Sequence, residues 1–380
     1  MSGLKIVADA NMRGVEAVFS QYGSVELVEG RNLRRGQLEG ADVLLVRSVT
    51  SVDSSLLQGT GVQFVGTATS GLEHVDQHYL QTQGVRFAHA RGSNANAVVE
   101  YVLAGIAACD DYLERLLAGG VLGIVGQGHV GRALARCARQ LGIQLRCYDP
   151  WLDAVEDAAE LDEVLGVDVL CLHPELTRQK PWPSYHLLDA ARLGQLPADS
   201  LLINASRGAV VDNAALLERL AAAPGQRCVM DVWEHEPHLL PGLLEQVDIG
   251  TPHIAGHSLD AKLEGTRMLG AALATAFDLV PPESQLAGPP VASLQAPENL
   301  QGADLLRWLL QARYEIRADD RALRDAVAGA PGSEVAAAFD ALRRDYPQRR
   351  ELRGSPVYAP AAPAAWASAL GYREPASGEG

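Results

Sequence analysis

Short apolar runs alternate with helical patterns along most of the chain, in two successive series. The first series comprises Leu4–Ala8, Val25–Val28, Val43–Val46, Gln63–Gly66 and Val85–Ala88. The second comprises Val121–Val125, Gln144–Tyr148, Val169–Leu172, Leu201–Asn204, Cys228–Asp231 and Val247–Gly250. Parallel strands need crossover connections, which helices usually provide. The alternation therefore predicts an α/β fold with two parallel sheets and crossover helices.

The remaining stretches suggest how these sheets are connected. Apolar residues at helical spacing predict helices over 96–117 (one long helix passing between domains), 257–280, 303–328 and 333–346. The proline-rich stretch 281–300 is predicted to be a linker. With a short strand expected over 356–359, the C-terminal part is predicted to be a small module for association.

Composition narrows the class of protein. The formal net charge is −15 at pH 7, which argues against a general nucleic-acid surface. No run approaches the ~18 apolar residues of a membrane span, and Asp9 interrupts the N-terminus before the core of a signal peptide forms. The five cysteines are scattered without a Cys-x-x-Cys pair, which is typical of reduced thiols. We therefore expect a cytoplasmic protein with small-molecule chemistry and no metal site.

A glycine-rich turn follows the first strand of the second series. The sequence Gly126-Gln127-Gly128-His129-Val130-Gly131 lies between an apolar strand and a helical stretch. In such a turn the first glycine allows tight bending, the second admits a pyrophosphate and the third lets the helix pack on the strand. Asp149 ends the next strand, at about the spacing of the acid that binds the adenosine ribose, and an acid there favours NAD over NADP.

Polar residues and glycines follow almost every predicted strand. Ligands of open α/β sheets bind at the carboxyl ends of the strands. One crevice is therefore expected beside Gly126, Asp149, His173, Ala205-Ser206-Arg207, Asp231 and His253. A second is expected beside Arg47-Ser48, Thr67–Gly71 and His89–Gly92, which predicts a cleft between two domains.

Three residues that follow strands of the second series have the chemistry of hydroxy-acid oxidation. Removing hydride from a 2-hydroxy acid needs a base for the hydroxyl proton and a cation for the carboxylate. His253 can act as the base, and Glu236 can stabilise the imidazolium and fix its tautomer. Arg207 offers a planar fork that matches a carboxylate.

These residues lie in segments that resemble the D-2-hydroxyacid dehydrogenase family. The matching stretches are Gly126–Gly131, Asn204–Asp212, Asp231–Pro237 and Thr251–Gly256. The resemblance implies a flavodoxin-like substrate domain made of residues 1–95 and 258–282, into which a Rossmann NAD domain of residues 96–257 is inserted. It also implies that Arg207, Glu236 and His253 are catalytic. The implied NAD contacts are Gly126, Gln127, Gly128, His129, Val130, Gly131, Asp149, Pro174, Ala205, Ser206, Arg207, Asp231 and Gly256.

A closer likeness to one subfamily concerns the substrate. It rests on Val46–Thr50, Phe64–Gly71, Val247–His257 and the extra C-terminal segment. It implies a small phosphorylated 2-hydroxy acid as substrate, contacts from Ser48, Thr69 and His257, and an α+β dimerisation domain over 283–380 that would make a homodimer. Because one arginine cannot pair with both a carboxylate and a phosphate, the other candidate cations are Arg47, Arg91, Arg349 and Arg350.

Two other interpretations remain open from the sequence. One is a family member with a different substrate, such as a 3-phosphoglycerate dehydrogenase. The other is an NAD-sensing protein without enzymatic activity, since related folds serve as corepressors. The complete Arg207, Glu236 and His253 set argues for an enzyme, and turnover of any 2-hydroxy acid would separate the two classes.

Overall fold

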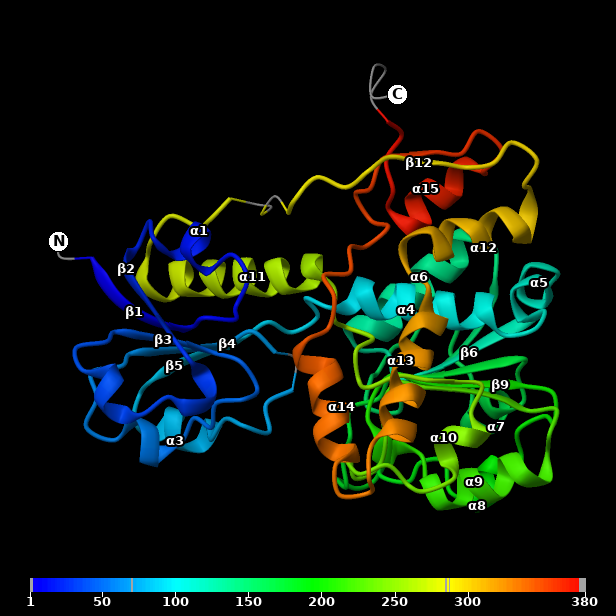
Figure 1. Cartoon of the computed structure of the whole chain (residues 1–380), viewed down its shortest axis with the longest axis horizontal. Helices are drawn as coiled ribbons and strands as arrows, with labels where there is room; N and C mark the ends of the chain where they lie inside the picture. Colours follow the sequence, from blue (N-terminus) through cyan, green and yellow to red (C-terminus); the bar gives the residue numbers. More distant parts are fainter. Residues whose placement is uncertain (1–2, 70, 284–285, 287, 376–380) are drawn as a thin grey trace. The chain divides into compact units, whose positions relative to one another are not determined.

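The chain forms two compact units in the computed structural model, which describes residues 3–69, 71–283, 286 and 288–375 (Figure 1). The first unit comprises Met1–Asn94 and Ser258–Pro290, and the second comprises Ala95–His257 and Val291–Gly380. Ser70, which belongs to the predicted Thr67–Gly71 turn, lies outside the described residues.

The first unit contains a parallel sheet of five strands. Its strands are β1 (Leu4–Asp9), β2 (Gly23–Val28), β3 (Val43–Val46), β4 (Phe64–Thr67) and β5 (Arg86–His89). All the pairings are parallel, and the spatial order is β2-β1-β3-β4-β5. This is the flavodoxin-like order, so the predicted fold class is confirmed for this unit.

Alternating side chains bury both faces of this sheet. Ile6, Val43 and Phe64 pack with two helices, α1 (Val15–Phe19) and α11 (Leu259–Phe277). On the other face, Val7 and Leu44 pack with η2 (Arg35–Leu38), α2 (Ser54–Leu57) and α3 (Gln77–Thr82); the short turn η1 (Gly30–Asn32) follows β2. Successive strand residues point to opposite faces, so helices on both sides account for the nearly continuous apolar strands.

The second unit contains a parallel sheet of six strands. These are β6 (Val121–Val125), β7 (Gln144–Tyr148), β8 (Val169–Leu172), β9 (Leu201–Asn204), β10 (Arg227–Met230) and β11 (Ile249–Gly250). Their spatial order is β11-β10-β9-β8-β6-β7. The order reverses between β6 and β8, which is the point where doubly wound sheets bind their ligands.

Helices also cover both faces of this sheet. One face is packed by α4 (Ala95–Ala108), α5 (Tyr112–Leu117) and α6 (His129–Gln140). The other is packed by α7 (Leu161–Leu165), α8 (Ala190–Leu193), α9 (Asn213–Ala222) and α10 (Leu243–Gln246), and the short turn η3 (Gly208–Val210) follows β9. The single helix predicted over 96–117 is wrong, because Asp110 takes a positive φ of 34° that interrupts it between α4 and α5.

The C-terminal segment is mainly helical. Its elements are β12 (Leu294–Gln295), α12 (Gly302–Arg313), α13 (Ile316–Gly329), α14 (Val335–Arg344), β13 (Val357–Tyr358) and α15 (Ala364–Leu370). β12 and β13 form a parallel pair. One helix was predicted over 303–328, but Tyr314 is extended (φ −142°, ψ 99°) and separates α12 from α13.

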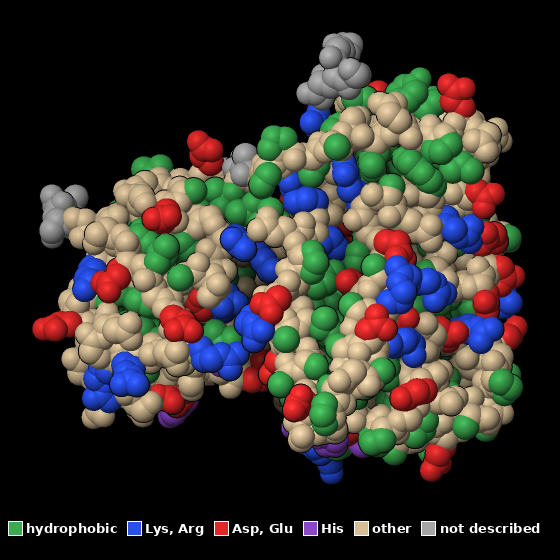
Figure 2. Space-filling model, viewed as in Figure 1, with side chains coloured by type: hydrophobic (Ala, Val, Ile, Leu, Met, Phe, Trp, Pro, Cys, Tyr) green, Lys and Arg blue, Asp and Glu red, His purple; other side chains and the backbone are tan. Residues whose placement is uncertain are grey.

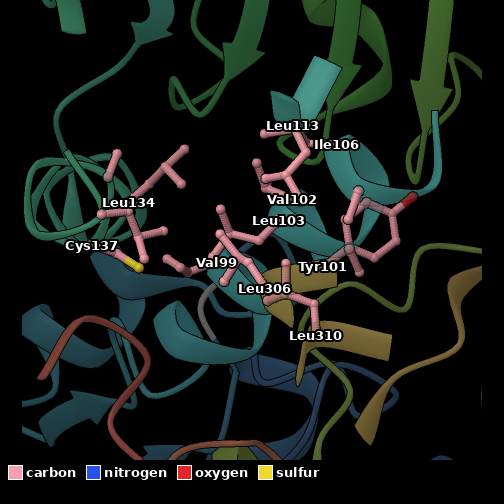
Figure 3. Packing of buried hydrophobic residues seen from close by; sticks show 14 of the residues in the cluster. Val99, Tyr101, Val102, Leu103, Ile106, Leu113, Leu134, Cys137, Leu306 and Leu310 are labelled. Atoms are coloured by element: carbon pink, nitrogen blue, oxygen red, sulfur yellow. The ribbon is translucent and has the colours of Figure 1, made fainter. Parts of the chain in front are cut away.

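The C-terminal segment shares the hydrophobic core of the six-stranded sheet and its helices. Leu306 and Leu310 of α12 belong to the same buried cluster as Val99 and Val102 of α4, and Figure 3 shows these side chains together. Leu323 of α13 and Phe339 of α14 join the cluster on the other face of the sheet. The described residues from 291 to 375 therefore group with the second compact unit, and the domain boundary expected at 283 stays a prediction.

The surface of the C-terminal helices carries charges of both signs. On α13, Arg321 pairs with Glu315 at 2.8 Å and Arg324 with Asp320 at 2.9 Å. Figure 2 shows basic and acidic side chains interspersed over this face of the second unit. Among the described residues, no helix is both long and apolar enough to cross a membrane.

All five cysteines are buried and unbridged. Burial raises the pKa of the Cys109 and Cys137 thiols to about 12 and that of Cys147 to about 11. These thiols are therefore protonated at neutral pH and pack as small apolar side chains.

Candidate active site

The glycine-rich turn between β6 and α6 has the steric features expected from the sequence. Gly126 has φ +91°, and a Cβ there would lie 2.5 Å from the nitrogen of Pro174. A Cβ at Gly131 would lie 1.9 Å from the carbonyl oxygen of Gly126. Both positions therefore require glycine, and the turn lies directly against the predicted cofactor residue Pro174.

Gly128 differs from the other two glycines because a Cβ there would meet no protein atom within 4 Å. Gly128 and His129 are exposed at the N-terminus of α6, the end toward which the first backbone N–H groups of a helix point. Open space beside such N–H groups fits a dinucleotide pyrophosphate. The turn can therefore hold NAD as predicted.

Asp149 lies at the end of β7 and braces this turn. Its Oδ2 accepts the N–H of Gln127 at 2.7 Å, and its Oδ1 accepts the N–H of Trp151 at 3.1 Å. The carboxylate is partly exposed, so it remains accessible to a ribose hydroxyl.

The loop after β9 carries Arg207, and hydrogen bonds from the side chain of Asn204 hold this loop in place. The Asn204 Oδ1 accepts the N–H and the hydroxyl of Ser206 at 3.2 and 2.9 Å, while its Nδ2 donates to the carbonyl of Arg207 at 3.1 Å. The guanidinium of Arg207 donates to the Ser206 carbonyl at 2.8 Å. Ala205 and Ser206 therefore present a fixed backbone at the carboxyl end of the sheet.

Gly208 brings this loop against the segment that carries Glu236. A Cβ at Gly208 would lie 1.9 Å from the carbonyl carbon of Trp233. The backbone directly after Arg207 therefore packs against the turn that carries Glu236. This role of Gly208 was missed from the sequence, although the glycine directly after Arg207 was a visible signal.

His253 and Glu236 form a hydrogen-bonded pair between Nδ1 and Oε1. The other oxygen of Glu236 accepts the N–H of Trp233 at 3.2 Å. Burial alone would raise the pKa of Glu236, but the hydrogen bond and charge of His253, the Trp233 N–H and the charge of Arg343 outweigh it and lower that pKa. Glu236 is therefore a carboxylate at neutral pH, and it leaves the Nε2 atom of His253 for proton transfer.

Asp231 holds the loop that carries His253. Its buried carboxylate accepts the Thr251 hydroxyl at 2.7 Å and the N–H groups of Ile254 and Ala255 at 2.7 and 2.9 Å, and its carbonyl accepts the N–H of His253 at 2.7 Å. Burial raises the pKa of Asp231, against the effects of His253 and these hydrogen bonds. The structure thus gives Asp231 a positioning role that the sequence interpretation, which made it an NAD contact, did not include.

Tyr101 extends this network into α4. Its hydroxyl is hydrogen-bonded to the Thr251 hydroxyl at 2.8 Å, and Trp233 Nε1 donates to the Thr251 carbonyl at 3.0 Å. Both aromatic residues are buried, and neither was singled out from the sequence. The apolar spacing around Tyr101 predicts only core packing, whereas Trp233 lies in the stretch Asp231–Pro237 that carries the family resemblance.

The predicted substrate residues of the first unit lie after β3 and β4. Arg47 donates from Nε to the buried carboxylate of Asp9 at 3.0 Å, and Ser48 is exposed in the next turn. The Thr69 hydroxyl is hydrogen-bonded to that of Thr67 at 2.8 Å, and the Thr67 hydroxyl is bonded to His74 Nε2 at 2.9 Å. Arg47 and Thr69 are therefore oriented by neighbours within their own unit.

The predicted residues near the C-terminus differ in their surroundings. The His257 ring lies edge-on to Tyr346, with centroids 5.9 Å apart. Gly256, the predicted nicotinamide contact, is partly exposed in the turn before it. Arg349 is only 7% exposed and donates to the carbonyls of Ala255 and Ala97, so it is not a surface arginine.

Comparison with known proteins identifies the family. Residues 88–255 match the family described as D-isomer specific 2-hydroxyacid dehydrogenase, NAD binding domain, and residues 285–371 match a domain of unknown function, DUF3410. The erythronate-4-phosphate dehydrogenase of Cellvibrio japonicus is 41% identical over 380 residues, covering 97% of this chain and 100% of the relative. That of Edwardsiella ictaluri is 44% identical, covering 92% and 93%.

Solved structures share the fold. A D-lactate dehydrogenase from Treponema pallidum has a TM-score of 0.60 at 22% identity, covering 73% of this chain and 98% of its own. A 3-phosphoglycerate dehydrogenase from Entamoeba histolytica with NAD+ bound has a TM-score of 0.60 at 18% identity, covering 76% and 99%. At these identities the likeness shows the fold alone.

The fold, the glycine-rich turn and the family match define an NAD-dependent dehydrogenase of the D-2-hydroxyacid type. Within that class, the full-length likeness shows that the chain belongs to the erythronate-4-phosphate dehydrogenase family.

Proposed function

We propose that this enzyme oxidises 4-phospho-D-erythronate to (R)-3-hydroxy-2-oxo-4-phosphobutanoate with NAD, a step in pyridoxal 5′-phosphate (vitamin B6) biosynthesis. The proposal is supported by family membership over nearly the whole chain. The observation that carries the chemistry is the hydrogen-bonded pair of His253 and Glu236.

The reaction breaks the O–H and C2–H bonds of the substrate and forms a C2 carbonyl. His253 Nε2 takes the hydroxyl proton, and the ionised Glu236 stabilises the imidazolium that results. Bound NAD supplies the oxidising power by accepting the hydride from C2. The products are the 2-oxo acid, NADH and one proton, so atoms and electrons balance.

Arg207 is proposed to hold the substrate carboxylate and polarise the forming carbonyl. Its position beside the turn of residues 233–236 supports that role. A guanidinium pairs with a carboxylate through two parallel hydrogen bonds, which fixes the face of C2 that loses hydride.

The remaining contacts are proposed from the family likeness. NAD contacts are assigned to Gly126–Gly131, Asp149, Pro174, Ala205–Arg207, Asp231 and Gly256. Substrate contacts are assigned to Arg47, Ser48, Thr69 and His257, in a substrate domain made of residues 1–95 and 258–282. We also propose a cytoplasmic homodimer that associates through the C-terminal segment of residues 283–380.

The test is a single-turnover measurement of nicotinamide absorbance. The enzyme with bound NAD is mixed separately with 4-phosphoerythronate, 3-phosphoglycerate and unphosphorylated erythronate, and a 2-oxo acid is added afterwards to reoxidise any NADH that does not leave. Reduction with 4-phosphoerythronate alone is the expected result. Reduction with 3-phosphoglycerate instead would retain the hydride-transfer mechanism and refute the proposed substrate, and reduction with none would refute the proposed reaction.

A further inference from the structure

The C-terminal segment contacts the loop of residues 251–257 on its buried side. Arg349 Nη2 donates to the carbonyl of Ala255 at 2.7 Å, two residues after His253. Tyr346 packs edge-on against His257. Both contacts lie within the second compact unit.

Arg349 is held in an unusual environment for a cation. It is 7% exposed, and its guanidinium carbon lies 4.1 Å from the ring centroid of Tyr314. Nη2 also donates to the carbonyl of Ala97 at 3.2 Å, whereas Nε and Nη1 have no hydrogen-bond partner among the described residues. The strongest directional contacts of this buried charge are therefore two backbone carbonyls, one on α4 and one on the loop that carries His253.

The Tyr314 ring that packs against the Arg349 guanidinium is itself held by neighbouring residues. The hydroxyls of Tyr314 and Tyr346 both donate to Asp319 Oδ2, at 2.9 and 2.7 Å. Tyr314 also packs against Tyr101, with ring centroids 6.2 Å apart. Tyr314, which packs against Arg349, therefore contacts Tyr101, and Tyr101 is hydrogen-bonded to Thr251 at the start of the loop.

The chain after Arg349 is anchored to α4 as well. The N–H groups of Leu352 and Arg353 donate to Glu100 Oε1, at 2.7 and 3.2 Å. Glu100 is buried, so these bonds are shielded from water. Arg349 is consequently fixed on both sides, by Tyr314 and by the 352–353 backbone.

Burying a cation costs free energy, which the charges of Glu100 and Glu351 help to offset at Arg349. Here the cation restrains the carbonyl of Ala255 while Asp231 restrains the N–H groups of Ile254 and Ala255. The N–H groups and the carbonyl of this segment are therefore held by two residues that lie far apart in the chain. Such restraint keeps a catalytic side chain within a fraction of an ångström of its working position.

We propose that Arg349 is a positioning residue for His253, through which the C-terminal segment supports catalysis in addition to any role in association. This inference rests on the proposed function, because it takes His253 to be the base. The segment acts on the reaction through the Ala255 carbonyl.

The experiment compares Arg349→Met and Arg349→Lys with the parent enzyme and with Arg344→Met. Arg344 is an exposed arginine of the same segment, paired with Asp345, and its replacement removes the same charge. Steady-state kinetics gives kcat and the KM for 4-phosphoerythronate, and hydrogen exchange followed by mass spectrometry reports on residues 251–257. All variants are used as full-length, NAD-loaded protein.

In Arg349→Met we expect kcat to fall by about 10- to 100-fold with a much smaller change in KM, because a misplaced base affects the chemical step more than binding. Exchange at residues 254–255 should be faster, and Arg349→Lys should recover part of both effects because one donor to Ala255 remains. Arg344→Met should match the parent.

Unchanged exchange and a kcat within twofold of Arg344→Met would overturn the proposal. If Arg349→Met does not fold, Arg349→Lys is judged by the same two criteria against Arg344→Lys. If the parent itself does not oxidise 4-phosphoerythronate, the proposed substrate fails, and the exchange comparison still decides whether Arg349 restrains the loop.

Discussion

His253 and Glu236 are hydrogen-bonded through Nδ1 and Oε1 although 17 residues separate them in the chain. Glu236 also accepts the Trp233 N–H, and Asp231 accepts the N–H groups that follow His253. The carboxylate of Glu236 thus orients the imidazole ring, and the carboxylate of Asp231 holds the backbone that follows His253. This arrangement fixes the tautomer before substrate arrives.

Replacing His253 by Ala should lower kcat/KM by ~10²–10⁴, because the substrate hydroxyl would lose its base. NAD affinity should stay within a few-fold of the parent, since the glycine-rich turn is untouched. Steady-state kinetics and a fluorescence titration with NAD measure the two quantities. His238→Ala removes an exposed histidine from the neighbouring segment and serves as the control. Parental turnover by His253→Ala would refute the assigned base.

Replacing Glu236 by Gln should lower kcat by about 10²-fold, because the imidazolium that forms when His253 takes the hydroxyl proton would lose the carboxylate that stabilises it. Steady-state kinetics with 4-phosphoerythronate measures kcat. Glu236→Asp keeps the charge and should lower kcat less than Glu236→Gln does. A kcat of Glu236→Gln equal to that of the parent would contradict the assigned role of the pair.

Much of the fold could be predicted because its signals are local. The apolar runs that became β3, β6 and β8 are bounded by polar or glycine residues, and the steric roles of Gly126 and Gly131 follow from backbone geometry. The candidates Arg207, Glu236 and His253 were also predictable, because each follows a strand at the ligand-binding edge of a parallel sheet.

The rest depends on burial between segments far apart in the chain. Asp110 interrupts a stretch with continuous helical spacing, and a sequence pattern does not report a single positive φ. Leu323 and Phe339 complete the core of the NAD-binding unit, which no local spacing could indicate. The burial of Arg349 under the His253 loop is likewise visible only in three dimensions.

The two glycines of the cofactor turn should respond differently to alanine. Gly128→Ala should leave the unfolding temperature within about 1–2 °C of the parent, because the added Cβ meets no protein atom. Its Kd for NAD should rise by about tenfold or more, since the methyl group takes up space beside the predicted pyrophosphate site. Calorimetry measures both.

Gly131→Ala is the matched comparison, because its Cβ would collide with the Gly126 carbonyl at 1.9 Å. It should lower the unfolding temperature as well as the NAD affinity. If Gly128→Ala binds NAD as tightly as the parent, the pyrophosphate does not lie beside Gly128.

Glu100 should make folding stability depend on pH in the direction opposite to an ordinary carboxylate. Burial raises its pKa to about 8, with the charge of Glu351 adding to this effect and Arg349 and the N–H groups of Arg353 and Leu352 opposing it. The folded protein therefore holds a proton that the unfolded chain releases near pH 4.5. This difference adds to the free energy of unfolding, fully so below pH 4.5. The added free energy is lost as the pH rises from there toward 8, by at most about 1.4 kcal/mol per pH unit.

Glu100→Gln removes this titration while its amide oxygen can still accept the Leu352 and Arg353 N–H groups. Relative to the parent, the variant should gain stability steadily between pH 5 and 8, in chemical denaturation measured at each pH. Glu114→Gln, at a partly exposed position in α5, controls for loss of a carboxylate and should show no such trend. Free-energy curves for the parent and Glu100→Gln that run parallel over this range would show that Glu100 titrates alike in the folded and unfolded chains.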